Sequence, residues 1–111
     1  MIIRYMQSPV VDINYEAKWV IAEMLNLGCE DDIKKLIHTE GCIECCIDVL
    51  NKRNDRKLIH NMILALTRCI EVEGELKEVY LNKGLKYILD NHLLVNPADD
   101  ICKKLLLKIN N

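Results

Sequence analysis

Aromatic residues and turn-forming residues are scarce in this chain of 111 residues. It has no Phe, one Trp and four Tyr, so its hydrophobic core must be built from Leu, Ile, Val, Met and Cys. It has four Gly and two Pro, which favours helices over a turn-rich β fold. The length is that of one small domain, and 50% of the residues are hydrophobic, which is enough to fill a core.

The chain also has no large excess of positive or negative charge and no long apolar run. The formal net charge is -2, which gives nucleic-acid binding little electrostatic support. No apolar stretch is long enough to span a bilayer, and residues 1–5 do not resemble a secretory signal. We therefore expect a cytoplasmic or nuclear protein with no membrane partner and no nucleic-acid partner, whose six cysteines are free thiols.

An internal repeat organises the chain. At an offset of 43 residues, Gly41 falls on Gly84 and the apolar residues around them coincide. A period of this length is typical of stacked helical repeats. The coinciding apolar pairs include Ile33 and Leu76, Cys42 and Leu85, Cys45 and Ile88, Cys46 and Leu89, Met62 and Leu105, and Ile63 and Leu106.

Each period predicts three helices, with a break at Gly41 or Gly84 between the first two. A residue without Cβ adopts the left-handed conformation that such a break needs. The apolar spacing predicts helices over 13–27, 30–38, 42–51, 56–71, 74–82, 85–94 and 98–109. The sequence therefore predicts one all-α domain over 1–111, divided into a partial repeat 1–28 and two repeats, 29–71 and 72–111.

Two segments resemble a known family. Residues 36–50, LIHTEGCIECCIDVL, resemble the armadillo-repeat signature, in which a helix, a Gly turn and an apolar helix follow one another. Residues 16–24, EAKWVIAEM, resemble the third helix of importin-α-type armadillo repeats. HEAT repeats have a similar period and are the alternative. The resemblance spans nearly the whole chain and implies a right-handed α-α superhelix, an armadillo- or HEAT-like solenoid with three helices per repeat.

The resemblance also implies a binding surface. In this family the third helices line a groove that binds partner proteins, with a Trp against the partner and an Asn four residues later holding its backbone. Trp19 matches the Trp, and Glu23 stands where the Asn is expected. The corresponding pairs in the two later repeats are Met62 with Leu66 and Leu105 with Ile109. Such an apolar row favours an amphipathic helix or a packed protein partner over an extended basic peptide.

Two functions compete at this point. The first is a protein-binding adaptor or scaffold that uses the third-helix surface. The second is a structural subunit that self-associates, because a repeat buries its apolar face only against a neighbour. The partial first repeat is expected to leave Ile2, Ile3 and Met6 partly uncovered, and these are the predicted self-association residues. A longer parent chain would cover the same surface.

Cys42, Cys45 and Cys46, with His38 one turn before them, have the ligand chemistry of a zinc or redox site. These cysteines fall where the later repeat has Leu and Ile, which favours core packing, because a buried Cys behaves as a small hydrophobic residue. Core packing is therefore the preferred interpretation, and no metal or cofactor is predicted.

No arrangement of residues predicts catalysis. The three His have no evident partner that would orient them beside a nucleophile, and the four Gly are solitary, so no phosphate-binding loop is present. The paired aspartates at 31–32 and 99–100 lie at predicted helix starts, where capping and the helix dipole explain them. The sequence predicts a protein that is not an enzyme.

Overall fold

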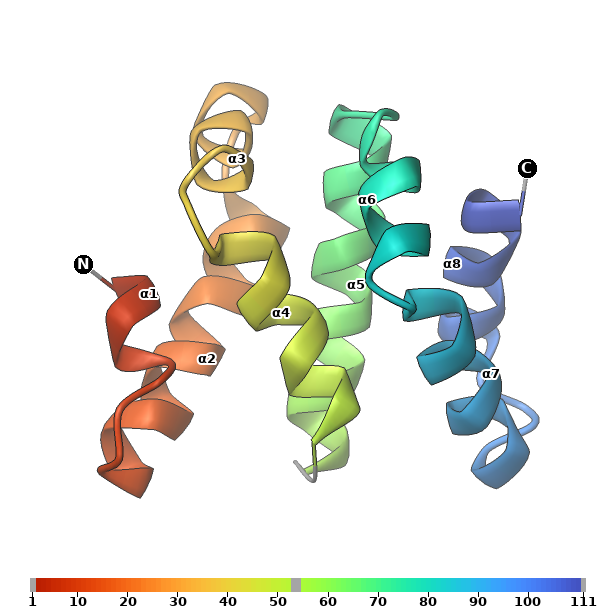
Figure 1. The fold of residues 1–111 in the computed structure, drawn as a ribbon, viewed down its shortest axis with the longest axis horizontal. Helices are drawn as coiled ribbons and strands as arrows, with labels where there is room; N and C mark the ends of the chain where they lie inside the picture. Colours follow the sequence, from red (N-terminus) through yellow and green to blue (C-terminus); the bar gives the residue numbers. More distant parts are fainter. Residues whose placement is uncertain (1, 53–54, 111) are drawn as a thin grey trace.

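The computed structural model describes residues 2–52 and 55–110, and the regular secondary structure of this part of the chain is all helical (Figure 1). The predicted all-α class is confirmed. The helices are α1 (Ile2–Tyr5), α2 (Val11–Leu27), α3 (Glu30–Ile37), α4 (Cys42–Asn51), α5 (Arg56–Val72), α6 (Leu76–Asn82), α7 (Leu85–Val95) and α8 (Asp100–Asn110).

The same order of helices occurs twice. In α3–α4–α5 and again in α6–α7–α8, a short helix leads through a glycine to a second helix and then to a third. Gly41 and Gly84 precede α4 and α7 with φ angles of 81° and 75°. These are left-handed conformations that glycine adopts without the steric cost of a Cβ. Both predicted breaks are therefore confirmed.

The third helices form a row. In Figure 1, α2, α5 and α8 lie side by side, with α5 in contact with both of the others. Helices α4, α6 and α7 lie on one side of this row. The row thus begins with α2 at the end of the molecule that carries α1 and finishes with α8 at the opposite end.

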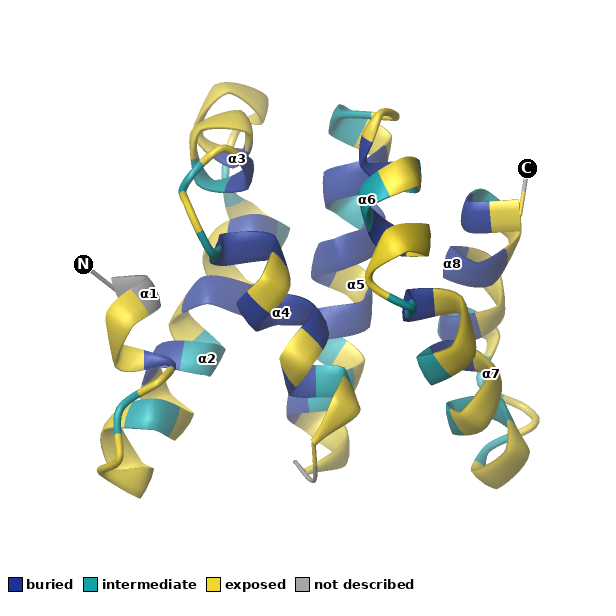
Figure 2. Cartoon of the chain, in the orientation of Figure 1, coloured by how far each residue is buried: buried dark blue, intermediate teal, exposed yellow. Residues whose placement is uncertain are grey.

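The core lies between these two sets of helices, where buried residues face one another (Figure 2). It is made mainly of Leu, Ile, Met and Cys, with some Ala, one Val and one Tyr. Tyr80 is the largest of its fully buried side chains, and its hydroxyl donates a hydrogen bond of 2.7 Å to the backbone oxygen of Leu66. The other large, fully buried side chains are Ile21, Leu25, Ile33, Leu58, Met62, Ile63, Leu66, Leu85, Leu89, Leu105 and Ile109.

Aspartates cap two helices of the row. The Asp55 carboxylate accepts a hydrogen bond of 2.8 Å from the backbone N–H of Leu58 at the start of α5. The Asp99 carboxylate accepts bonds of 3.1 Å from the N–H groups of Ile101 and Cys102 at the start of α8. Each cap satisfies backbone donors that have no partner within the helix.

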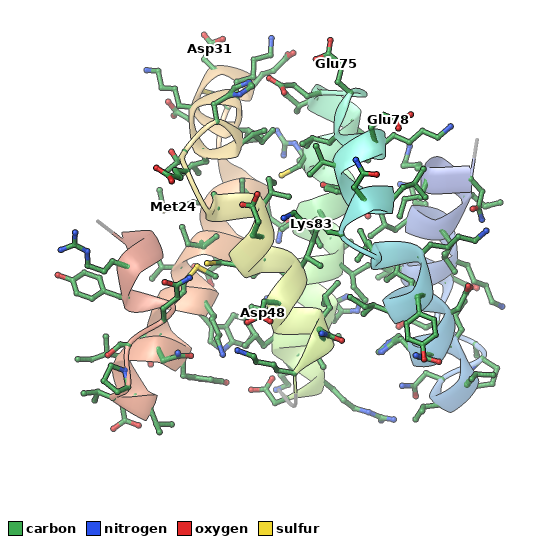
Figure 3. The ribbon with its side chains drawn as sticks, viewed as in Figure 1. Met24, Asp31, Asp48, Glu75, Glu78 and Lys83 are labelled. Atoms are coloured by element: carbon green, nitrogen blue, oxygen red, sulfur yellow. The ribbon has the colours of Figure 1, made fainter. Side chains whose placement is uncertain are left out.

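Charged side chains project from the outside of the helices, for example Asp31, Glu75 and Lys83 in Figure 3. Among the described residues, no helix combines the length and apolar character needed to cross a membrane.

Candidate partner-binding surface on α2, α5 and α8

The row of third helices carries a depression of about 580 Å³ that extends over all three of them. The sequence predicts a binding site on this surface of the third helices. The depression is lined by Glu23, Asn26 and Leu27 of α2, by Asn61, Leu64, Thr67, Arg68 and Glu71 of α5, and by Ile101 and Lys104 of α8.

Four predicted binding residues lie in the core instead. Met62, Leu66, Leu105 and Ile109 are each at most 1% exposed, so their side chains do not face a partner, and this part of the prediction is wrong. The physical reason is the apolar stripe itself. A helix in a row turns its most continuous apolar face toward the interior and leaves the mixed face to solvent.

The register of the first repeat explains the error. The first residues of α2 and α5 are 45 residues apart, not 43. With this spacing, Trp19 and Glu23 correspond to Leu64 and Arg68 rather than to Met62 and Leu66. Leu64 and Arg68 do line the depression.

Trp19 and Glu23 differ in their surroundings. Glu23 is exposed and lines the depression, whereas Trp19 is partly buried against the core. The Trp19 ring meets the edge of the Tyr15 ring, with centroids 6.2 Å apart. The Tyr15 hydroxyl in turn donates a hydrogen bond of 2.5 Å to the carboxylate of Asp55. Trp19 therefore helps to join α2 to the start of α5.

Polar contacts fix the floor of the depression. The Arg68 guanidinium donates hydrogen bonds of 2.8 Å and 3.0 Å to the backbone oxygens of Asn26 and Gly28. These oxygens lie at the end of α2, where helix carbonyls lack partners within the helix. The Asn26 side-chain amide donates a bond of 3.0 Å to the backbone oxygen of Asn61. The depression thus has a rigid frame made from two helices.

Charges of both signs surround this frame. Glu23 and Glu71 are acidic, and Arg68 and Lys104 are basic. Lys108 approaches the Glu71 carboxylate at 3.9 Å, a long contact between partly exposed groups. Exposed ion pairs of this kind add little stability, but they select and orient charged partners.

The predicted self-association residues divide into two groups. The side chains of Ile2 and Ile3 lie outside the part of the chain that the structure describes. Met6 is 4% exposed, so the prediction that it is uncovered is wrong. The Asn14 side-chain amide donates a hydrogen bond of 2.6 Å to the backbone oxygen of Met6. This bond holds the turn after α1 against α2, and the Met6 side chain is part of the core.

The cysteines on α4 pack in the core, as predicted. Cys42 and Cys46 are fully buried, and Cys45 is covered by Gln7, whose side-chain amide donates to its sulfur at 3.3 Å. A hydrogen bond with Cys42, together with burial, raises the pKa of Cys46, and burial raises the pKa of Cys69 to about 12. Cys46 and Cys69 are therefore protonated and poorly nucleophilic, whereas the hydrogen bond with Cys46 lowers the pKa of Cys42. Within the described residues, no group of three or more His, Cys, Asp or Glu side chains is arranged to hold a metal ion.

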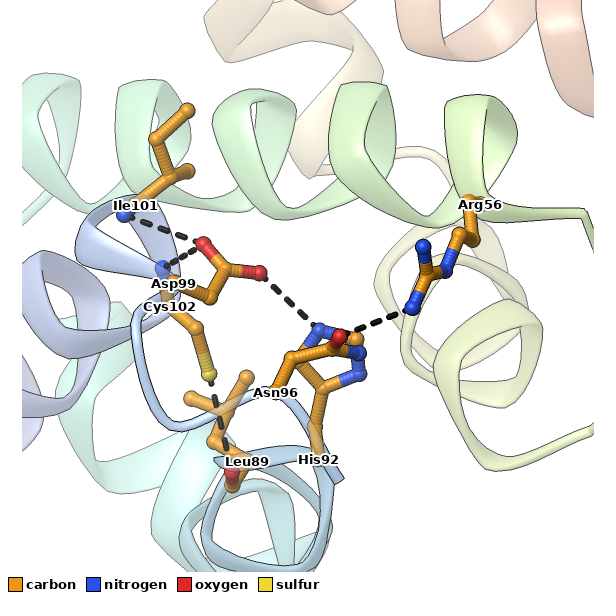
Figure 4. Close-up of polar contacts among 7 residues, drawn as sticks. All are labelled: Arg56, Leu89, His92, Asn96, Asp99, Ile101 and Cys102. Atoms are coloured by element: carbon orange, nitrogen blue, oxygen red, sulfur yellow. Dashed lines mark hydrogen bonds and ion pairs between the residues drawn. The ribbon is translucent and has the colours of Figure 1, made fainter. Parts of the chain in front are cut away.

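A second hollow, of about 380 Å³, lies between the start of α5 and the loop from α7 to α8 (Figure 4). The His92 ring nitrogen lies 3.0 Å from the carboxylate of Asp99, and Arg56 donates a bond of 2.9 Å to the side-chain oxygen of Asn96. Sequence reasoning missed this group, although the capping role of the aspartates at 99–100 was predicted. The contacts tie the loop to α5 and to the cap of α8.

Comparison with protein-family models, with curated proteins and with solved structures finds no match to this chain.

Proposed function

We propose that this chain is a non-enzymatic protein-binding module, an adaptor or scaffold that holds a peptide or helix of its partner across α2, α5 and α8. The observation that carries this proposal is the depression that extends over all three helices. Specific recognition needs apolar contact area together with a few fixed polar groups. The lining offers both, on a floor that the contacts of Arg68 and Asn26 hold in place.

The lining favours a partner with a defined order of groups. Glu23 stands on α2 and Lys104 stands on α8, at opposite sides of the depression. Leu64 on α5 lies between them, beside the amide of Asn61. A partner segment that crosses the row therefore carries a basic group over α2, an apolar group over α5 and an acidic group over α8.

We further propose that the helices form part of an armadillo-type superhelix, with HEAT repeats as the alternative. The repeated order of short helix, glycine, second helix and third helix supports this proposal. The row of α2, α5 and α8 is the arrangement from which a groove lined by third helices is built.

The surroundings of the reactive side chains support a role other than catalysis. The thiols of Cys46 and Cys69 have raised pKa values, in the second case because of burial. His38 lies 2.6 Å from the Glu73 carboxylate and His92 lies 3.0 Å from that of Asp99, so both imidazoles serve as contacts between segments of the chain.

The test uses peptides selected from a random display library on the immobilised protein, with their affinities then measured by calorimetry. Leu64→Glu places a charge at the centre of the depression and should weaken binding by about tenfold or more, because central apolar contacts dominate interfaces. Leu81→Glu is the matched control, since Leu81 is 38% exposed and Leu64 is 36% exposed, but Leu81 lies on α6.

The control should bind within about twofold of the unchanged protein, a difference well under 1 kcal/mol. Equal affinity of Leu64→Glu and Leu81→Glu for the selected peptides would contradict the proposal. Circular dichroism of both variants establishes that the helices are retained.

A further inference from the structure

The side of α2 that faces away from α5 carries an exposed apolar stripe. Ile13, Val20 and Met24 are 42–45% exposed, and Figure 3 shows Met24 at the end of the molecule formed by α2 and α3. Val20 lies seven positions, or two helical turns, after Ile13, and Met24 lies one turn after Val20. The three side chains therefore share one helix face. Part of the stripe lines a hollow of about 520 Å³ together with Tyr5 and Glu16.

The same stripe is buried in the next helix of the row. At the spacing of 45 residues between α2 and α5, the stripe positions correspond to fully buried residues of α5. Helix α5 as a whole contacts several other helices, among them α2 and α4. The corresponding pairs are Ile13 with Leu58, Val20 with Ala65, and Met24 with Cys69. The outer face of α2 therefore has the composition of a face that packs against a further helix.

The opposite end of the row offers such a helix. Leu107 of α8 is 62% exposed, and Tyr87 and Leu94 of α7 are more than 70% exposed. Lys103 is exposed one turn before Leu107, on the same face of α8. This end of the molecule thus combines exposed apolar side chains with a basic residue.

The two end helices carry opposite charges. Helix α2 contains three acidic residues and one basic residue, whereas α8 contains one acidic residue and three basic residues. Asp12 and Glu16 flank the stripe of α2 and are exposed, as is Lys103 on α8. Opposite charges at the margins of two apolar surfaces favour their association and fix its orientation.

We infer that the occupant of the α2 face is a second copy of this chain, whose α8 packs against the stripe so that the row of third helices continues from one molecule into the next. Such a contact is head-to-tail, because it joins two different surfaces of the same molecule. None of its apolar residues, which are Ile13, Val20, Met24 and Leu107, lines the proposed partner-binding depression. Within one molecule, α2 packs against α5 and α5 packs against α8. The inferred contact would add the α2 of a second molecule after α8 in the same row.

Sedimentation velocity over a range of concentrations tests this inference. The weight-average mass of the unchanged protein should rise with concentration, up to about 1 mM, where even weak association is detected. Val20→Glu and Leu107→Glu should each weaken self-association by about tenfold or more, because each places a charge in one of the two apolar surfaces. Leu81→Glu, at a similarly exposed position on α6, should associate like the unchanged protein.

Mixing the two variants is the decisive step. Val20→Glu retains an intact α8 face and Leu107→Glu retains an intact α2 face, so an equimolar mixture should form dimers of one of each and nothing larger. A mixture that stays monomeric while the unchanged protein associates would overturn the head-to-tail contact. A monomeric unchanged protein at all concentrations would also overturn it and would assign the α2 face to a different molecule. Leu64→Glu should associate normally, which separates this result from failure of the proposed function.

Discussion

The two complete three-helix units, α3–α4–α5 and α6–α7–α8, have the same order of helices but different interiors. Where the first unit places Cys42 and Cys46 in the core, the second places Leu85 and Leu89, and all four side chains are fully buried. A thiol is smaller than an isobutyl group, so the same helix order accommodates different core volumes. The turn at each glycine, rather than one particular core residue, therefore sets the path of the chain.

The caps of α5 and α8, the third helices of the two units, differ in a second way. The carboxylate of Asp55 binds Tyr15, which lies 40 residues earlier on α2, whereas that of Asp99 binds His92, which lies seven residues earlier on α7. The first cap therefore links two units, while the second closes a loop within one unit. The partner of the first is a tyrosine hydroxyl, and the partner of the second is an imidazole.

The largest expected difference between the units is in how much free energy of unfolding is lost when a core side chain is replaced by Ala. Leu89→Ala should lower the free energy of unfolding by about 3 kcal/mol, because it leaves a cavity in a fully buried position. Cys46→Ala, at the corresponding position, should cost about 1 kcal/mol because it removes one atom. Urea denaturation followed by circular dichroism measures both.

Equal losses of unfolding free energy for Leu89→Ala and Cys46→Ala would contradict this prediction. That result would mean that the sulfur of Cys46 makes contacts worth as much as the Leu89 side chain. Cys29→Ala is the control for changes that concern thiol chemistry alone, since Cys29 is exposed.

Both caps should weaken in acid, because folding lowers the pKa of Asp55 and of Asp99. Burial raises the pKa of Asp99, but hydrogen bonds from the Cys102 amide and from His92 outweigh it, so the pKa lies below the ordinary value of 3.8. A carboxyl group whose pKa is lowered by folding stabilises the protein above its ordinary pKa and loses this effect as pH falls through the folded value. Asp99→Ala should therefore cost about 1 kcal/mol at neutral pH and progressively less below about pH 4.

Asp55→Ala should cost less than Asp99→Ala, because Asp55 is exposed and Asp99 is partly buried. The measurement is the urea midpoint of each protein at a series of pH values. A difference between Asp99→Ala and the unchanged protein that persists undiminished in acid would show that the cap does not act through its ionised form.

The glycines that the two units share should show an effect of about the same size as the cap of α8. Gly84→Ala should lower the free energy of unfolding by about 1 kcal/mol, since a Cβ is disfavoured at positive φ although no atom lies within 4 Å to clash with it. Gly41→Ala should cost about as much. Gly74 has the same open surroundings without the positive φ, so Gly74→Ala should change the free energy by a few tenths of a kcal/mol at most. If Gly84→Ala lowered the free energy of unfolding no more than Gly74→Ala does, the left-handed turn at Gly84 would not be what holds the first two helices of the unit in place.

Much of the fold follows from local signals in the sequence. The apolar spacing predicts the longer helices, and the glycines predict the turns, because a left-handed residue without Cβ is a local requirement. The packing of the cysteines of α4 follows from their alignment with Leu85, Ile88 and Leu89. These predictions rest on residues that are close in the sequence, and they do not require knowledge of how one three-helix unit packs against the next.

The surface could not be predicted in the same way. The row of Met62, Leu66, Leu105 and Ile109 has the apolar spacing of a stripe that faces the core, but the resemblance, aligned at an offset of 43 residues, assigns these residues to the groove. The shift from 43 to 45 residues in the first interval moves the predicted surface onto the core face. The contacts of Arg68 with the end of α2 connect residues 40 to 42 positions apart, for which no local signal exists.

The most direct test of the proposed function is nuclear magnetic resonance of the labelled protein titrated with a peptide selected from the library. We predict that the backbone amide shifts change along the exposed faces of α2, α5 and α8, around Glu23, Leu64 and Lys104, and stay constant in α6. Shift changes confined to α6 and α7, with none around Leu64, would contradict the assignment of the binding surface to the third helices.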